Sequence, residues 1–247
     1  MIMVVRCIKA EFAKCRHSAL LYMHILVPFL GAAAFAGYFR ISGWDVQTNI
    51  SAYLEVLAAA FPFLIGSVVG MVVSQENQAG HWQTMLGTIP SRAAAYLGKL
   101  SFLMISAAGA AAMALCCYAA ISRKAPLALY LKAWILLVLA VFPLYLVHLF
   151  IGMRFGKGAS MGLGIAGSLL AALMITGLGD AVWKYIPWAW GVRFMDYTVL
   201  SWSNPDVFQL VRHDFIAGIV IALFFSLLLF VLSILWFRSW EGYREND

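Results

Sequence analysis

Charged residues are scarce in this chain of 247 residues: Asp, Glu, Lys and Arg together make up only 11% of it. An ordinary soluble domain contains about 25% of these residues. Here 64% of the residues are hydrophobic, and the mean hydropathy is +0.88. A compact soluble fold of this size does not bury that much apolar surface, and a disordered chain needs the opposite balance. The composition therefore excludes both classes and leaves an integral membrane protein.

The motifs of several enzyme classes are also missing. The four cysteines, Cys7, Cys15, Cys116 and Cys117, have no C-x-x-C or zinc-finger spacing, so we expect neither disulfides nor a metal site. There is no Walker A motif, because the nearest match, Gly152–Gly158, has the wrong spacing and no Ser or Thr after its lysine. H-E-x-x-H and G-x-S-x-G are absent as well. We therefore expect no catalysis and no cofactor in this chain itself.

Six apolar runs are long enough to cross a bilayer, which takes about 20 residues per helix. Inside a membrane every backbone polar group needs an internal partner, so such runs form helices. The sequence therefore predicts an all-α integral membrane protein with six transmembrane helices, in a single transmembrane domain over residues 1–247. The runs are Ala19–Phe39, Ala52–Val73, Leu100–Ile121, Leu127–Ile151, Ala159–Gly179 and Phe215–Phe237.

Residues 1–18 have a different pattern. Apolar residues recur at helical spacing from Val5 to Ala19, and Arg6, Lys9 and Arg16 lie beside them. This pattern predicts an amphipathic helix on the inner membrane surface. A basic flank that only sets the topology is the alternative, and both interpretations place this segment at the cytoplasmic surface.

The positions of the basic residues predict the orientation. Six spans place both termini on one side, and with the N-terminus inside, ten of the 17 Lys and Arg residues lie on the inner side. This bias accounts for the net charge of +6 without nucleic acid as a partner. We expect a multi-pass protein with both termini, including the tail 238–247, in the cytoplasm.

Two further features concern the interior of the spans. His24 and His148 lie within apolar runs, and we interpret them as buried hydrogen-bonding groups rather than as part of a proton pathway. Small residues allow close contact between helices in membranes. They are equally consistent with an interface along which the helices of a transporter slide. They gather in and before the fifth run, at Gly152, Gly156, Gly158, Gly162, Gly164 and Gly167.

Short motifs along the chain resemble the permease subunits of type-2 ABC exporters. Ile8–Lys14 resembles the opening of these subunits. Glu76–Gly80, Pro90–Arg92 and Lys99 resemble their Glu-x-x-x-Gly, Pro-x-Ser-Arg and Lys pattern. The order and spacing of these motifs extend the resemblance over essentially the whole chain.

Two other motifs, Pro187-Trp188 and Trp240–Gly242, resemble one branch, the lantibiotic immunity permeases of the MutG/EpiG-like family. The resemblance implies a type-2 ABC exporter permease fold in the bacterial cytoplasmic membrane. It also implies a second homologous permease subunit and two copies of an ABC ATP-binding subunit, which binds the ATP and Mg. The cargo would be a lantibiotic-type antimicrobial peptide, whose export gives self-immunity or resistance.

The resemblance assigns the inner segment 74–99 to coupling with the ATPase. The residues concerned are Glu76, Gln78, Gly80, His81, Trp82 and Arg92. Glu76 resembles the family's coupling glutamate, and its carboxylate would pair with a basic residue of the ATPase or cap a short helix. An ordinary solvated loop is the alternative.

The outer segment 180–214 would meet a cationic amphipathic peptide in the outer leaflet. Its aromatic residues favour the membrane–water interface, and Pro187 and Pro205 predict short helices broken at these points. The residues expected to face the substrate are Asp180, Trp183, Trp188, Trp190, Asp196, Trp202 and Asp206.

Two alternatives to this function remain open at the level of the sequence. One is a permease of the same class with another cargo, such as a bacitracin-like antibiotic or a lipid. The other is a membrane protein that does not transport, such as an assembly factor or a sensor subunit.

Overall fold

A computed structural model describes residues 2–16, 18–80, 82, 87 and 91–240, and its regular elements are all helical. Five of the helices, α2, α3, α5, α6 and α8, are long and apolar enough to cross a membrane. In chain order the elements are α1 (Ile2–Cys15), α2 (Ala19–Ile41), α3 (Val46–Gln78), α5 (Arg92–Ser122), α6 (Leu127–Leu173), the 3-10 turns η1 (Gly177–Gly179) and η2 (Trp183–Tyr185), α7 (Pro187–Ser203) and α8 (Pro205–Ser239).

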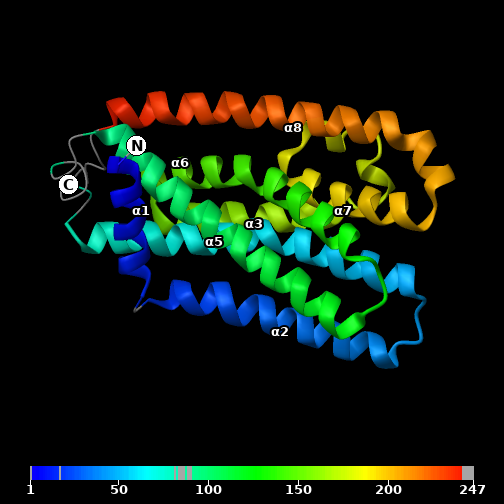
Figure 1. Ribbon diagram of the computed structural model, residues 1–247. Coiled ribbons are helices and arrows are strands. Elements are labelled where there is room, and N and C mark those ends of the chain that lie inside the picture. The colour runs from blue at the N-terminus through cyan, green and yellow to red at the C-terminus, as the bar shows by residue number, and fades with distance from the viewer. Residues whose placement is uncertain (1, 17, 81, 83–86, 88–90, 241–247) are drawn as a thin grey trace.

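The long helices run side by side in a bundle, and α1 lies across one end of it (Figure 1). The end of α8, the end of α3 and the start of α5 lie at this same end, which we call the terminal end. The turns from α2 to α3 and from α5 to α6 lie at the opposite end, which we call the far end. The start of α1 and the end of α8 thus lie at the same end of the bundle.

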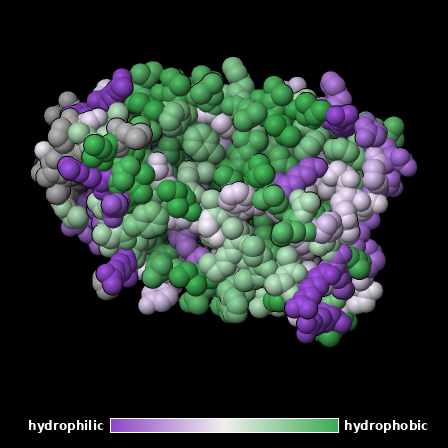
Figure 2. All heavy atoms as spheres, in the orientation of Figure 1, coloured by the Kyte–Doolittle hydropathy of each residue, from purple (hydrophilic) through white to green (hydrophobic). Residues whose placement is uncertain are grey.

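Hydrophobic and hydrophilic side chains are distributed differently along the length of the bundle. On the face in Figure 2, hydrophobic side chains cover the middle and hydrophilic ones gather toward the two ends. Exposed side chains in α2 and α8 are largely apolar, as Leu30 and Leu227 illustrate. Apolar atoms exposed on this scale are stable only against lipid or another protein, so the helices cross the membrane along the bundle axis.

Helix α6 is not straight. Gly156 has φ +85° and ψ −179°, a conformation that is essentially restricted to glycine. Nδ1 of His148 lies 3.2 Å from Oγ of Ser160, although twelve residues of straight helix would separate them by about 18 Å. The chain therefore turns back at Gly156, and α6 is a hairpin with two antiparallel arms, residues 127–155 and 157–173. The turn lies at the terminal end, where Gly156 and Trp82 line the same cavity.

The two arms correspond to the predicted runs Leu127–Ile151 and Ala159–Gly179. The other four predicted runs lie within α2, α3, α5 and α8. The second arm is about 25 Å long, which is short of the roughly 30 Å hydrocarbon core, and it ends at Leu173 rather than at Gly179. The chain then continues through η1 and η2 into α7. The structure thus shows five candidate spans, and the sixth crossing stays a prediction.

Glycines bring α3 and the second arm of α6 into backbone contact, as the clustered small residues predicted. A Cβ atom added to Gly66 would lie 2.5 Å from the carbonyl oxygen of Ser160. One added to Gly164 would lie 2.7 Å from the carbonyl oxygen of Pro62. Both are closer than real Cβ contacts, so these positions require glycine. Between them, His148 and Ser160 form a buried pair, and Ser160 also donates to the carbonyl of Gly66.

Both connecting segments are more helical than the sequence suggested. In the inner segment 74–99, α3 continues to Gln78 and α5 begins at Arg92, so only residues 79–91 connect them. In the outer segment 180–214, α7 begins at Pro187 and α8 at Pro205, where the prolines predicted breaks. Asn204 caps α8 by accepting a hydrogen bond from the amide of Val207 at 3.2 Å, which is why this helix starts ten residues before the apolar run.

The orientation can be tested by cysteine labelling after the four native cysteines are changed to alanine. We expect an impermeant maleimide to label Asp206→Cys, at the far end, in intact cells. Arg154→Cys, beside the hairpin turn, is expected to react only after the membrane is permeabilised. The reverse pattern would show that both termini face outward.

The hairpin turn can be tested at Gly156. Gly156→Val forces a β-branched residue into a backbone region that only glycine adopts readily, and we expect it to lower stability by about 1–3 kcal/mol. Gly158→Ala is the matched control, because an added Cβ atom meets nothing within 4 Å there. Thermal unfolding of the purified chain in detergent measures both. Equal melting temperatures for the two variants would contradict the hairpin.

Candidate functional site

Four charged side chains from three helices meet at the terminal end, and we call them the charge cluster. They are Glu11 and Lys14 of α1, Glu76 of α3 and Lys99 of α5. Nζ of Lys99 lies 2.7 Å from Oε2 of Glu11 and 2.8 Å from Oε1 of Glu76. Nζ of Lys14 lies 2.8 Å from Oε1 of Glu11 and 2.5 Å from Oε1 of Glu76. Two ammonium groups thus bridge two carboxylates, and the cluster is formally neutral.

Burial makes this pairing necessary. Lys99 is fully buried, Glu11 and Glu76 are nearly so, and only Lys14 reaches the surface, with its side chain 42% exposed. An unpaired buried charge costs several kcal/mol, whereas a fully paired one is tolerated. Partial burial of Lys14 opposes its charge, but hydrogen bonds to Glu11 and Glu76 outweigh this and raise the pKa of Lys14 above its usual value. Lys14 therefore stays charged while the three helices stay together.

Close packing holds α1 against α5 beside the cluster. A Cβ atom added to Gly98 would lie 2.3 Å from Cβ of Cys7, so only glycine allows this contact. One turn further along, the rings of Phe12 and Phe102 meet edge to face, with centroids 4.9 Å apart. Cys7 thus serves as a small apolar side chain, and α1 is attached to the bundle by both packing and charge.

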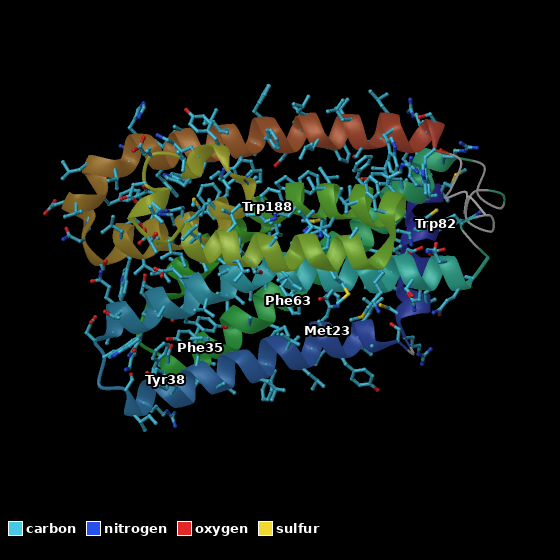
Figure 3. All side chains as sticks on the ribbon, turned by 180° about the vertical axis from the view of Figure 1, so that it is seen from behind. Met23, Phe35, Tyr38, Phe63, Trp82 and Trp188 are labelled. Atoms are coloured by element: carbon cyan, nitrogen blue, oxygen red, sulfur yellow. The ribbon has the colours of Figure 1, made fainter. Side chains whose placement is uncertain are left out.

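The connection between α3 and α5 is tied to α8. Nη1 of Arg92 donates hydrogen bonds to the carbonyls of Trp240, at 2.9 Å, and Arg238, at 3.3 Å. The buried ring of Trp82 packs against Trp240 with centroids 5.2 Å apart, and it lies at the terminal end beside α1 in Figure 3. Four helices, α1, α3, α5 and α8, therefore converge near Trp82 and Arg92.

The structure changes the interpretation of the predicted coupling residues. Glu76 lies in the last turn of α3 rather than in a loop, and its carboxylate is bound by Lys14 and Lys99 of the same chain. Within this chain its carboxylate pairs with these two lysines and does not cap a helix. Gln78 ends α3 and is exposed, as is Gly80, which has φ +116°. His81 lies outside the described residues.

Sequence reasoning missed three members of the cluster. The sequence analysis used Glu11, Lys14 and Lys99 only as parts of family motifs or as charges that set the membrane topology. A usable signal was present, because acidic residues are few and Lys99 is followed by a long apolar run. A lysine that enters the bundle at such a position needs a carboxylate partner, although the sequence does not show which one.

Some of the predicted substrate-facing residues of the outer segment are buried in the structure, and others are exposed. Trp183 and Trp190 are fully buried and do not face the outside, because their rings fill the interior around α7. A Cβ atom added to Gly218 would lie 2.2 Å from the ring of Trp183, and Trp190 donates to the carbonyl of Lys184 at 2.9 Å.

Trp188 also lies inside the bundle (Figure 3), where its ring covers Gly167. Asp196 and Trp202 are partly buried, while Asp180 and Asp206 are exposed. Arg193 of α7, which the sequence analysis treated only as a basic residue, binds the chain after α6. Its guanidinium donates to the carbonyls of Met174 and Thr176 and to the carboxylate of Asp180, at 2.7–2.8 Å.

One family profile, described as ABC-2 family transporter protein, matches residues 7–176. This range contains the whole charge cluster and every element from α2 to α6. The chain belongs to the ABC-2 transporter family. This ABC-2 permease is accordingly a multi-pass membrane component of a transporter that works with a separate ABC ATPase subunit. No curated protein and no solved structure matches the chain.

The charge cluster of the permease predicts a specific pattern of stability. Lys99→Met leaves the two carboxylates of Glu11 and Glu76 with Lys14 as their single cationic partner. We expect this variant to lower the free energy of unfolding by roughly 3–5 kcal/mol. Glu76→Gln combined with Lys99→Met removes one charge of each sign, so the double variant should be more stable than Lys99→Met alone. Thermal unfolding in detergent gives the coupling energy.

Lys9→Met, an exposed lysine on α1, is the control and should stay within about 0.5 kcal/mol of the parent. Additive effects in the double variant would show that Glu76 and Lys99 do not interact.

Proposed function

We propose that this ABC-2 permease exports a lantibiotic-type antimicrobial peptide from the bacterial cytoplasmic membrane and thereby gives self-immunity or resistance. In this proposal it acts with a second homologous permease and two copies of the ATP-binding subunit, which binds ATP and Mg. The choice of cargo rests on the resemblance of Pro187-Trp188 and Trp240–Gly242 to lantibiotic immunity permeases.

The observation that carries an exporter mechanism is the convergence of four helices near Trp82 and Arg92. The ATPase subunits close in the cytoplasm, so their movement has to enter the permease at its cytoplasmic end. A push on residues 79–91 reaches α3 and α5 directly, because these helices flank the segment. It reaches α8 through Arg92 and Trp82, and α1 through the charge cluster.

The charge cluster contributes stiffness to this arrangement. Its two buried carboxylates each contact both lysines, so α1, α3 and α5 cannot separate at this end without exposing unpaired charge. Movement that enters here is therefore passed along the helices toward the far end. There, the exposed carboxylate of Asp206 is available to a cationic peptide.

The test is peptide protection in a sensitive bacterium that expresses the complete transporter. Arg92→Ala removes the charged hydrogen bonds to α8, which are worth about 1.5–3 kcal/mol. We expect membrane insertion and ATPase binding to be retained, while the protective effect against a lantibiotic falls about tenfold. Purified permease alone should show no ATP hydrolysis, and hydrolysis should appear with the partner subunit.

Arg154→Ala is the matched control, because Arg154 is an exposed arginine at the same end without a bond to α8. Full protection by Arg92→Ala at equal expression would remove residues 79–91 from the transmission path. Protection by the parent against bacitracin but not against a lantibiotic would identify the cargo as a different antibiotic. If no ATP-binding subunit copurifies, a non-transport sensor or assembly role replaces the proposal.

A further inference from the structure

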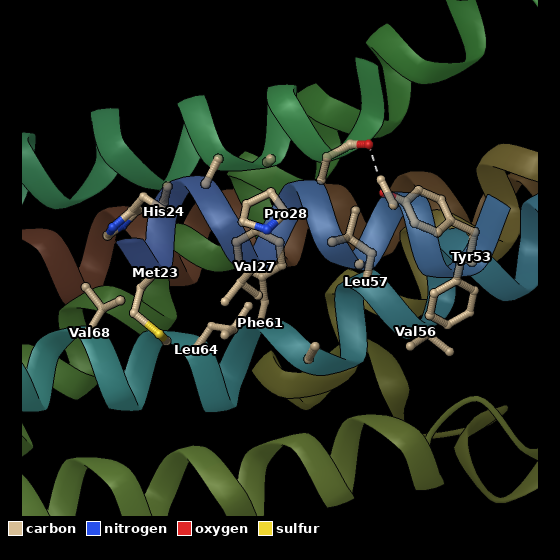
Figure 4. A pocket seen from close by; sticks show the side chains of 18 of the residues that line it. Met23, His24, Val27, Pro28, Tyr53, Val56, Leu57, Phe61, Leu64 and Val68 are labelled. Carbon is tan, nitrogen blue, oxygen red and sulfur yellow. Dashed lines mark hydrogen bonds between the residues drawn. The ribbon is translucent and has the colours of Figure 1, made fainter. Parts of the chain in front are cut away.

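Two cavities lie one after the other along the interface between α2 and α3. Helix α2 packs mainly on α5, where alanines of both helices meet, and it contacts α3 only lightly. The first cavity, which we call the polar cavity, has a volume of about 170 Å³ and lies at the terminal end. The second, which we call the apolar cavity, has a volume of about 150 Å³ and lies deeper in the bundle (Figure 4).

The apolar cavity is suited to hydrocarbon. Side chains such as Val27 of α2 and Leu64 of α3 project into it (Figure 4), and alanines of α5 also line it. Two of its polar side chains are already engaged, since Tyr53 donates to the carbonyl of Ala114 at 2.8 Å and Nδ1 of His24 lies 2.7 Å from the carbonyl of Leu20. An apolar cavity of about 150 Å³ stays dry and accepts a group of the size of benzene.

The polar cavity has the opposite chemistry. Its lining includes the hydroxyls of Ser18 and Ser74, the amides of Gln75 and Gln78, and the ammonium-bearing side chain of Lys157. None of the described residues that line it carries a carboxylate, and the neighbouring Glu76 is bound within the charge cluster. Among the described residues, Lys157 has no ion-pair or hydrogen-bond partner. One cation among neutral hydrogen-bonding groups is a setting that favours a phosphate oxygen.

The two cavities follow one another in the same order along α2 and α3. On α2 the polar cavity reaches Leu20 and the apolar cavity begins at Met23. On α3 the corresponding residues are Met71 and Val68, so the cavities are separated by about one helical turn on each side. From Met23 to Phe35 the apolar cavity follows α2 for about 18 Å. One leaflet of the hydrocarbon core is about 15 Å deep.

From this succession we infer that the α2–α3 interface binds one phospholipid of the membrane leaflet at the terminal end. The phosphate lies in the polar cavity against Lys157, and one acyl chain enters the apolar cavity between α2 and α3. The charge of Lys157 selects the anionic headgroup, and the apolar lining of the second cavity selects hydrocarbon. The inference concerns the permease alone and holds for any cargo that the transporter carries.

The experiment is a titration of the full-length purified chain, stripped of lipid in detergent, with phosphatidylglycerol, followed by native mass spectrometry. We expect one tightly bound lipid. Lys157→Gln removes a charged hydrogen bond to the phosphate and should weaken binding roughly tenfold or more. Gly31→Leu should weaken it by a similar factor, because Gly31 lines the apolar cavity and an added side chain meets open space there.

Each variant has a matched control. Arg154→Gln makes the same change in charge on the other side of the hairpin turn, and Gly37→Leu makes the same addition to an exposed face of α2 outside the cavity. Both controls should bind phosphatidylglycerol within about twofold of the parent, since neither residue lines the site. Lys157→Arg keeps the charge and should restore binding, which separates loss of the ligand contact from misfolding.

Two results would overturn the inference. Equal weakening by test and control variants would mean that lipid binds the whole surface without a site. Displacement of the lipid by inorganic phosphate at a similar concentration would identify a site for free phosphate that makes no use of the apolar cavity. Because the titration contains neither ATPase nor peptide, its failure leaves the proposed export function standing.

Discussion

A buried ammonium group must be neutralised, and this requirement organises the terminal end of the permease. Lys99 is fully enclosed at the start of α5, so two carboxylates have to approach it from other helices. One comes from α3, which continues as a helix to Gln78 and brings Glu76 into reach. The other comes from α1, which lies across the bundle and is held there by Glu11. The position of α1 and the short connection between α3 and α5 both depend on this pairing.

The bundle is unevenly packed as a result of its small residues. On one side, Gly66 and Gly164 let α3 and the second arm of α6 touch through their backbones, which leaves little space between them. On the other side, α2 rests on alanines of α5, and two cavities separate it from α3. The tightly packed side resists deformation. We expect conformational change to involve α2 before it involves α3 and α6.

The sequence predicted the helical class and most of the apolar runs, because hydropathy records which segments avoid water. Hydropathy does not distinguish contact with lipid from contact with protein, and for this reason the burial of Trp183 and Trp190 was not foreseen. The two apolar runs on either side of residues 152–158 predicted a break there, but one glycine among six in that region carries no local sign that the chain turns at Gly156. The pairing of Glu76 with Lys99 depends on contacts between distant segments, which periodicity along a single helix does not reveal.

The hairpin in α6 has a consequence for biogenesis. Its two arms are joined at a single residue, and Arg154 and Lys157 flank this residue on either side. Because charged residues are costly to move across a bilayer, we expect the two arms to enter it as a pair rather than one after the other. The contact between His148 and Ser160 forms within that pair. A polar histidine is thus matched with its partner before the rest of the bundle assembles around it.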